Sequence, residues 1–305
     1  MKRLARWGLG RLERTGFFRS KPLLAPLLRT LWRTLRAPTP EAGQAAVNAL
    51  AMDSFARYPI LFHDRHDLEY LLYPDQNAEI YLANNGNYEI GETEFCLARL
   101  RSDMIVFDVG ANIGLYTLLF ARQVGPGGRV HAFEPEPRNY RRLLVNLALN
   151  GCDNVTPNAA AVFSRSQPVT LHVYPDAYHA WHSLERSAMP DPTGDGRQVL
   201  PEHDLEIAAT SLDDYCQQHG VQRIDYLKID VEGAELDVLR GAAGLLARQA
   251  VGLIQFEMSP QSPADVFELL ADAGFRCHPI AASGDLGSPV HSFQPGYANY
   301  AAIRL

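Results

Sequence analysis

The stretch IVFDVGANIG, residues 105–114, constrains the fold of this chain more than any other. An apolar run ends in Asp108, and Gly110 and Gly114 follow before the helical pattern of LYTLLFARQV begins. An apolar run that stops at glycine and leads directly into a helix is typical of a buried strand in an α/β sheet. We expect Gly110 to allow a turn that a Cβ would forbid, and Gly114 to let a ligand approach the start of the next helix.

Strand and helix patterns alternate from residue 104 onward. The apolar patterns MIVFDVG, RVHAFEP, IDYLKIDVEG and VGLIQFEM are separated by helical patterns such as PRNYRRLLVNLALN and AELDVLRGAAGLLAR. This alternation predicts a doubly wound, mostly parallel sheet whose central strands are buried on both faces. FRCHPIAA and YANYAAIRL have no helix between them, which predicts an antiparallel hairpin at one edge. PVTLHVY and DLEIAAT predict a further strand pair around a polar loop at 175–202.

Charge divides the chain into a basic head and an acidic body. Residues 1–36 carry ten Lys and Arg against one acid, whereas the remainder carries 18 basic and 34 acidic residues, a net charge of −16. An acidic body disfavours a nucleic-acid enzyme, because phosphate binding needs a basic surface. We predict a basic amphipathic segment at 1–43, a lead-in or cap region at 44–100, and the functional domain at 101–305.

The head has a helical pattern from Pro26, with apolar residues on one face and arginines across from it. The apolar face consists of Leu27, Leu28, Leu31, Trp32 and Leu35. Three interpretations stay open: a helix docked on the protein's own core, a helix lying in a membrane interface with its arginines at anionic headgroups, and a targeting peptide. No stretch approaches the roughly 20 apolar residues of a spanning helix.

Cysteine usage indicates the compartment. The four cysteines, Cys96, Cys152, Cys216 and Cys277, are too far apart for a zinc or redox motif, which fits reduced thiols in a cytosolic-type compartment. We predict a cytoplasmic protein, with peripheral contact of residues 1–36 at the inner face of a membrane left open. The sequence does not indicate the oligomeric state.

Two carboxylates at strand ends indicate the cofactor. Glu134 closes RVHAFEP about 20 residues after Gly114, where a carboxylate commonly holds the two hydroxyls of a ribose. Asp108 lies two residues before the first glycine, where it would repel a pyrophosphate but suit the ammonium of a bound amino acid. S-adenosylmethionine has that ammonium, a ribose and no phosphate. The residues therefore favour S-adenosylmethionine, and methyl transfer over hydride transfer, with Asp108, Gly110, Asn112, Gly114 and Glu134 as cofactor-binding residues.

Four blocks of the sequence together resemble a known family. FDVGANIGLYT, VHAFEPEPRNY, SLDDY and LKIDVEGAELDVLRG are similar to the FkbM family of S-adenosylmethionine-dependent methyltransferases, over roughly residues 86–260. The resemblance implies a seven-stranded class I (Rossmann-like) methyltransferase fold and O-methylation of sugar or polyketide-type hydroxyls. It also matches the five cofactor-binding positions one by one. The implied acceptor is a small molecule or glycan, including a glycolipid.

The reacting centre is expected at the ends of two later strands. Transfer to a hydroxyl requires alignment of the acceptor and removal of its proton. Asp230 follows a buried strand, and Glu257 ends the next one, so we predict both as catalytic residues. His182, in the loop YHAWHSLE with His179 and Trp181, is the third candidate because a histidine is a natural base near neutral pH. Glu232 fits either a catalytic role or a carboxylate at a helix start.

Several alternatives accompany these predictions. A divalent metal held by Asp230, Glu257 and a histidine is conceivable but is not predicted. An NAD-dependent Rossmann oxidoreductase is the main rival, although the third glycine of its motif is missing. A non-catalytic cofactor-binding scaffold is the other. Asp213 and Asp214 are expected to cap the short helix of SLDDYC.

Overall fold

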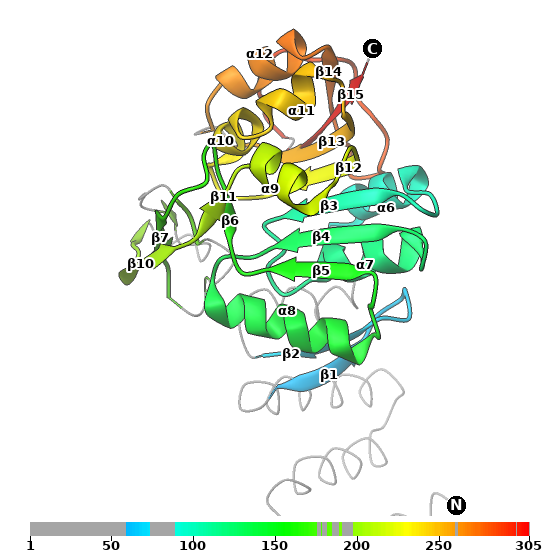
Figure 1. The fold of residues 1–305 in the computed structure, drawn as a ribbon, viewed down its shortest axis with the longest axis vertical. Coiled ribbons are helices and arrows are strands. Elements are labelled where there is room, and N and C mark those ends of the chain that lie inside the picture. Colours follow the sequence, from blue (N-terminus) through cyan, green and yellow to red (C-terminus); the bar gives the residue numbers. More distant parts are fainter. Residues whose placement is uncertain are drawn as a thin grey trace, which may run out of the picture. The chain divides into compact units, whose positions relative to one another are not determined.

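The structure is a computed structural model that describes residues 59–73, 89–175, 178, 182–184, 189–190, 198–259, 262–296 and 298–304. The chain divides into two compact units, one of residues 1–61 and 72–74, the other of residues 62–71 and 75–305. The second unit contains the sheet and the helices named below (Figure 1). The predicted basic segment at 1–43 lies outside the described residues, as do residues 44–58 and 74–88 of the predicted lead-in or cap region.

A seven-stranded sheet forms the centre of the second unit, in the order β14-β15-β13-β12-β3-β4-β5. All neighbours are parallel except β15, which is antiparallel to both β13 and β14. The fold is therefore the predicted class I methyltransferase fold, mostly parallel with an antiparallel edge. The strands are β3 (Ile105–Val109), β4 (Arg129–Phe133), β5 (Val155–Asn158), β12 (Ile224–Ile229), β13 (Val251–Glu257), β14 (Phe275–Pro279) and β15 (Asn299–Arg304).

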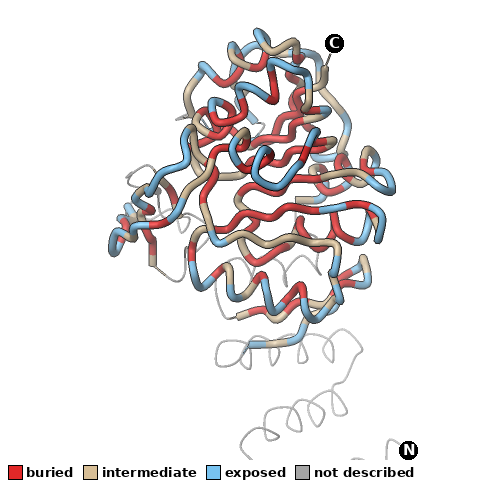
Figure 2. The backbone as a smooth tube through the Cα atoms, viewed as in Figure 1, coloured by how far each residue is buried: buried red, intermediate tan, exposed pale blue. Residues whose placement is uncertain are grey.

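The central strands are buried on both faces, as their apolar sequences predict. In β3, four consecutive residues from Val106 to Val109 are buried, and β12 is buried throughout except at Asp225. Figure 2 shows these strands as a continuous buried layer between more exposed helices. Burial on both faces leaves only the strand ends accessible, which places the functional side chains there.

Seven helices accompany the sheet in the described part of the chain; α7 lies behind it in Figure 1 and α9 in front. They are α6 (Ile90–Arg99), α7 (Leu115–Val124), α8 (Pro137–Leu149), α9 (Leu212–His219), α10 (Glu235–Arg240), α11 (Ala243–Ala247) and α12 (Asp265–Asp272). The start of α8 follows from its sequence: Pro137 occupies the first turn, and the Glu136 side chain accepts hydrogen bonds from two backbone N–H groups.

The predicted cap of α9 was wrong. Ser211 is the N-cap residue and accepts a hydrogen bond from the Asp214 N–H at 3.1 Å. Asp213 instead accepts hydrogen bonds from the N–H groups of Gly244 and Leu245, at 2.7 and 2.8 Å. The Asp213 carboxylate thus binds free N–H groups at the start of α11. Gly244 lies 31 residues further along the chain, so no local sequence pattern could reveal this contact.

The prediction of a single helix for AELDVLRGAAGLLAR was also wrong, because this segment forms two short helices, α10 and α11. The break lies at Gly241, where an added Cβ would come within 2.2 Å of the Phe163 carbonyl oxygen. The chain at Phe163 therefore packs directly on the helix backbone, and only glycine leaves room for it.

Short strands complete the described fold. β7 (Val169–Val173) pairs antiparallel with β10 (His203–Ile207), which confirms the predicted pair. β6 (Ala161–Val162) pairs in parallel with β11 (Ala209–Thr210), and β8 (Met189–Pro190) pairs with β9 (Gln198–Val199). β1 (Ile60–His63) and β2 (Glu69–Leu72) precede the sheet. No described helix combines the length and the apolar character that a membrane crossing needs.

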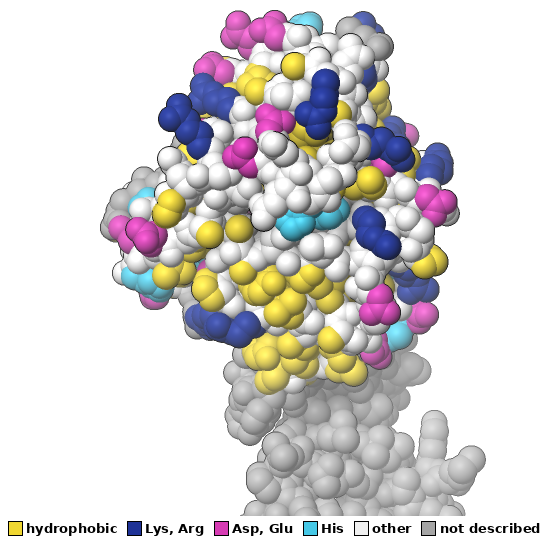
Figure 3. Space-filling model, viewed as in Figure 1, with side chains coloured by type: hydrophobic (Ala, Val, Ile, Leu, Met, Phe, Trp, Pro, Cys, Tyr) yellow, Lys and Arg dark blue, Asp and Glu magenta, His cyan; other side chains and the backbone are white. Residues whose placement is uncertain are grey.

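The face seen in Figure 3 carries Lys, Arg, Asp and Glu side chains interspersed, without a basic stripe. Apolar side chains gather over α8, where Leu144, Val145 and Leu149 are exposed.

Candidate active site

A cavity of about 270 Å³ lies at the carboxyl ends of β3, β4, β12 and β13. Seven of the eight predicted site residues line it: Asp108, Gly110, Asn112, Glu134, His182, Asp230 and Glu257. The position follows from the topology, because the carboxyl ends of parallel strands meet at one edge of the sheet.

Gly110 fixes the turn at the end of β3. Its φ is 86°, and an added Cβ would lie 1.7 Å from the Asp230 carbonyl oxygen. The N–H groups of Gly110 and Ala111 both donate to the Phe133 carbonyl oxygen, at 3.0 and 2.9 Å. The loop after β3 is therefore held against the ends of both neighbouring strands, and only glycine fits there.

Gly114 has a different place from the one expected. It is the N-cap residue of α7 with a φ of 96°, and an added Cβ would lie 2.7 Å from Leu143 Cδ1 of α8. The glycine is thus needed for its left-handed backbone and for close packing against α8, and Leu115 and Ile113 line the cavity on either side of it.

Asp108 is fully buried and has one oxygen unused. Oδ2 accepts a hydrogen bond from Thr117 Oγ1 at 2.5 Å, whereas Oδ1 has no hydrogen-bond partner among the described residues. Lys228 stands opposite Asp108 in register on the neighbouring strand β12. Burial raises the pKa of Asp108, against the opposing effects of Lys228 and Thr117. A buried carboxylate oxygen without a donor fits the ammonium of S-adenosylmethionine.

Glu134 is oriented by two backbone donors. The N–H of Asn112 donates to Oε2 and the N–H of Glu136 donates to Oε1, each at 2.8 Å. Burial raises the pKa of Glu134 to about 8, although these two hydrogen bonds lower it. Asn112 itself has a left-handed φ of 48°, and its Oδ1 is buried without a partner among the described residues. Both side chains thus keep acceptor capacity that fits the hydroxyls and amines of a nucleoside.

A charged pair and a hydrogen-bonded carboxyl form the other end of the cavity. Lys228 Nζ donates to Asp230 Oδ2 at 2.7 Å. Burial would raise the pKa of Asp230, but the Lys228 charge and the side-chain hydrogen bonds from Glu257 and Lys228 lower it. Burial together with Asp230 raises the pKa of Glu257 well above its usual range. Glu257 therefore holds the proton of this pair and Asp230 holds the negative charge.

Sequence reasoning missed Glu89 and Tyr116, which both line this end of the cavity. Glu89, just before α6, lines the cavity, and its Oε2 accepts a hydrogen bond from the Tyr116 hydroxyl at 2.6 Å. The Tyr116 ring centroid lies 4.3 Å from Lys228 Nζ. Glu232 also lines the cavity, and burial followed by repulsion from Asp230 raises its pKa to about 8. The left-handed backbone of Glu89 leaves no sequence pattern, so only the folded chain reveals it.

His182 lines the cavity with its imidazole orientation fixed. Its Nδ1 accepts a hydrogen bond from the backbone N–H of Tyr174 at 3.1 Å. A neutral ring that accepts at Nδ1 carries its proton on Nε2, so that nitrogen donates. His179 and Trp181 lie outside the described residues. Among the described side chains, no three His, Cys, Asp or Glu residues are arranged to hold a metal ion.

Comparisons with known proteins agree with this geometry. The profile of the methyltransferase FkbM domain matches residues 108–277. The 31-O-demethyl-FK506 methyltransferase of Streptomyces tacrolimicus is 31% identical over 170 residues, which are 49% of this chain and 65% of that protein. The hexuronic acid methyltransferase AglP of Haloferax volcanii is 28% identical over 178 residues, 58% of this chain and 65% of that protein. The chain thus spans less than two thirds of the length of these relatives.

Solved structures were compared as well. The S-adenosylmethionine-dependent O-methyltransferase of Thermotoga maritima aligns over 84% of this chain and 82% of its own, with 14% identity and a TM-score of 0.39.

Proposed function

Because this chain belongs to the FkbM family of S-adenosylmethionine-dependent methyltransferases, we propose that it methylates a hydroxyl oxygen of a sugar, glycolipid or polyketide-type small molecule. Membership of this methyltransferase family excludes the alternative of an NAD-dependent oxidoreductase. One observation carries the O-methyl assignment: Lys228, at 2.7 Å, keeps the Asp230 carboxylate ionised. Asp230 lines the same cavity as residues 110–113 of the loop after β3, here called the cofactor loop. The names of the Streptomyces and Haloferax relatives support an acceptor that is a small molecule or a sugar.

The cofactor end of the cavity orients the methyl donor. S-adenosylmethionine, when bound, supplies an electrophilic methyl group on a positively charged sulfur. Asp108 binds its ammonium with the unused Oδ1, and Glu134 accepts hydrogen bonds from its ribose hydroxyls. Gly110 lets the backbone turn so that the ligand enters beside β3. These residues fix the direction from which an acceptor must approach.

Asp230 removes the acceptor proton. A hydroxyl oxygen becomes strongly acidic as it gains a methyl group, so even a carboxylate of lowered pKa can take the proton in the transition state. Lys228 keeps Asp230 ionised and in place, and protonated Glu257 donates a hydrogen bond to it. His182 lines the cavity and accepts a hydrogen bond at Nδ1, so its neutral ring carries the proton on Nε2, and we assign it as a donor to the acceptor molecule instead of the predicted base.

Labelled methyl transfer tests this function. The full chain is incubated with tritiated S-adenosylmethionine and extract from cells that lack the protein, and labelled products are analysed for methyl ethers. Asp230→Asn should reduce turnover by about 10²–10⁴-fold while S-adenosylhomocysteine still binds. Asp272→Asn, at an exposed position of α12, is the matched control and should leave turnover unchanged. Normal turnover in Asp230→Asn would remove Asp230 from the reaction.

Residues 1–36 supply a second part of the proposal, contact with an anionic membrane where a lipid-linked acceptor would lie. Their ten basic residues and amphipathic pattern support it. Sedimentation with vesicles of phosphatidylcholine and phosphatidylglycerol should retain the full chain and lose a variant that lacks residues 1–36. Equal binding of the two proteins would leave the core-docked interpretation of this segment.

A further inference from the structure

Glu89 contributes to the cavity from outside the matched methyltransferase domain. It directly precedes α6, whereas the matched residues are 108–277. Its carboxylate is joined to the Lys228–Asp230 pair through Tyr116, which donates its hydroxyl hydrogen to Glu89 and places its ring 4.3 Å from the Lys228 ammonium. Glu89 therefore belongs to the end of the cavity that holds Lys228, Asp230 and Glu257, here called the acceptor end. The mechanism described so far does not use Glu89.

The backbone at Glu89 indicates that this placement is not incidental. Its φ is 43°, and Glu232 and Asn112 have φ values of 52° and 48°. In the described part of the chain, these are three of the six non-glycine residues with positive φ, and all three line this one cavity. Side chains other than glycine adopt such backbone rarely, and functional sites are where it is retained.

The N-terminus of α6 gives a second, independent indication that the Glu89 side chain serves the cavity. Glu89 occupies the N-cap position of α6, where a carboxylate can bind the free N–H groups of the first turn. Its side chain makes no such hydrogen bond. The carboxylate instead faces Tyr116 and the cavity.

Charge at the acceptor end restricts what can bind there. Four carboxyl groups line it, those of Glu89, Asp230, Glu232 and Glu257. Lys228 is the only Lys or Arg among the described lining residues, and its ammonium is already bound to Asp230. Asp230 is the ionised carboxylate, whereas burial raises the pKa values of Glu89, Glu232 and Glu257. An acceptor with a carboxylate or phosphate beside the reacting oxygen would therefore be buried near Asp230 with no uncommitted cation among the described lining residues, whereas hydroxyl groups can form hydrogen bonds with these carboxyl groups.

We propose that Glu89 binds the hydroxyl next to the one that Asp230 deprotonates, so that the acceptor is a neutral vicinal diol such as an uncharged sugar ring. The inference rests on the proposed O-methyl transfer and specifies its substrate. The carboxyl groups of Asp230 and Glu89 at one end of the cavity match two hydroxyl groups on adjacent carbons, as Glu134 matches the ribose diol at the other end. Uronic acids are thereby disfavoured as substrates of this chain.

The methylated product gives the first test. The labelled product of the extract reaction is hydrolysed to the unit that carries the methyl group, which is then examined by anion exchange and mass spectrometry. We expect a neutral unit with a free hydroxyl on a carbon adjacent to the methoxyl. An acidic unit, or one without an adjacent hydroxyl, would overturn the inference. If the wild-type chain yields no labelled product, the proposed function itself fails, which is a distinguishable result.

Kinetics of variants give the second test, with the acceptor isolated in the first. Glu89→Gln keeps the size of the side chain but weakens it as an acceptor, so the KM for the acceptor should rise about tenfold with kcat within about threefold. The dissociation constant of S-adenosylhomocysteine should not change. Glu94→Gln removes an exposed carboxylate of the same helix, one bound to Arg65, and should leave KM unchanged. An unchanged KM in Glu89→Gln, or a parallel loss of cofactor affinity and Tm, would make Glu89 structural.

Discussion

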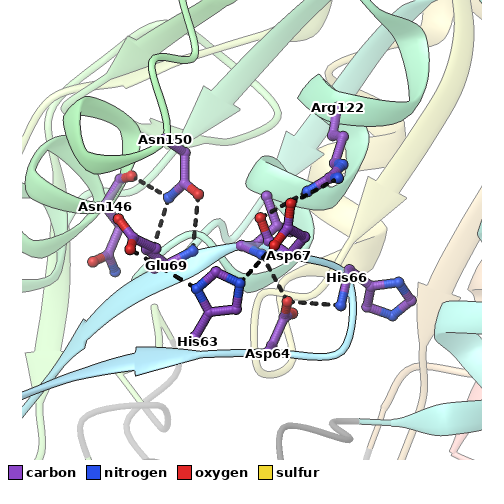
Figure 4. A network of polar contacts seen from close by, with 9 residues as sticks. His63, Asp64, His66, Asp67, Glu69, Arg122, Asn146 and Asn150 are labelled. Atoms are coloured by element: carbon purple, nitrogen blue, oxygen red, sulfur yellow. Dashed lines mark hydrogen bonds and ion pairs between the residues drawn. The ribbon is translucent and has the colours of Figure 1, made fainter.

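Asn146 donates a hydrogen bond from Nδ2 to the carbonyl oxygen of Ile113, in the cofactor loop, at 2.8 Å. Its Oδ1 accepts from the Leu71 N–H of β2, also at 2.8 Å, and the side chain is fully buried. One amide of α8 therefore joins a strand upstream of the matched domain to the loop that holds the cofactor. Asn150, one turn later, binds the backbone N–H and carbonyl of Glu69 instead (Figure 4).

The two asparagines make a matched pair for mutation. Asn146→Ala and Asn150→Ala should each lower the free energy of unfolding by about 1–3 kcal/mol, because each leaves backbone groups of β2 without a partner. Only Asn146→Ala also frees the Ile113 carbonyl, so only this variant should weaken S-adenosylhomocysteine binding, by about fivefold. Chemical denaturation and calorimetric titration measure the two effects. Equal affinity in both variants would show that β2 does not support the loop.

Gly110 should tolerate no side chain. Gly110→Ala places a Cβ within 1.7 Å of the Asp230 carbonyl oxygen at a φ of 86°, so β3 and β12 must separate at their ends. We expect a loss of more than about 4 kcal/mol of stability, or no folded protein, with no cofactor binding. Gly151 also has a positive φ, 60°, but nothing lies within 4 Å of its Cβ position. Gly151→Ala should cost only about 1 kcal/mol. A similar Tm for the two variants would contradict the packing argument.

The residues at strand ends were predictable because topology alone brings them together. Asp108, Glu134, Asp230 and Glu257 each close an apolar strand pattern, and parallel strands end at one edge of the sheet. Lys228 could be inferred as a partner of a carboxylate because side chains alternate along a strand and Ile229 takes the other face.

Glu89 was beyond sequence reasoning for a physical reason. No periodic pattern marks it, and the path of the chain across the cavity depends on packing between α6 and residues far away in sequence. The same limit applies to Asp213, which caps a helix 31 residues away, and to Gly241, where the approach of Phe163 divides a helix that its own sequence would continue. Local patterns predict elements, but contacts made only after folding decide these details.

Binding of the cofactor should release a proton through Glu134. An unfolded glutamate has a pKa of about 4.3, whereas burial raises the pKa of Glu134 to about 8. Between these values the folded protein holds a proton that the unfolded chain lacks, so this group's contribution to stability falls as pH rises through this window. Ribose hydroxyls donate to the ionised carboxylate. S-adenosylhomocysteine affinity should therefore rise with pH up to about 8.

Calorimetric titration at pH 7 in two buffers of different ionisation enthalpy measures that proton directly. Glu232 and Glu235, with pKa values of about 8 and about 7, titrate in the same range, so the difference between proteins is the informative quantity. Glu134→Gln should release about one proton fewer than the wild-type chain, and its affinity should depend less on pH. Equal proton release from both proteins would exclude Glu134 as the group that ionises on binding.

The Lys228–Asp230 pair, at the end of β12, has a more exposed counterpart at the start of that strand. Arg223 and Asp225 are also two residues apart and 2.7 Å from each other, but the Arg223 side chain is 63% exposed, against 3% for Lys228. Burial makes the two pairs different in energy. Lys228→Met should lower the free energy of unfolding by about 3–5 kcal/mol, because Asp230 loses its partner inside the protein. Arg223→Met should leave the free energy of unfolding nearly unchanged, because an exposed ion pair contributes little.

The same two variants separate a positioning role of Lys228 from a merely structural one. The Lys228 charge lowers the pKa of Asp230 against the effect of burial, so Lys228→Met should raise that pKa. Asp230 is active only when ionised, and the acid limb of the pH–rate profile should therefore move to higher pH by more than one unit in Lys228→Met and stay in place in Arg223→Met. Loss of stability with an unmoved acid limb would mean that Asp230 does not set the rate through its ionisation, because removal of the cation that holds it charged would then have no effect on the pH dependence of catalysis.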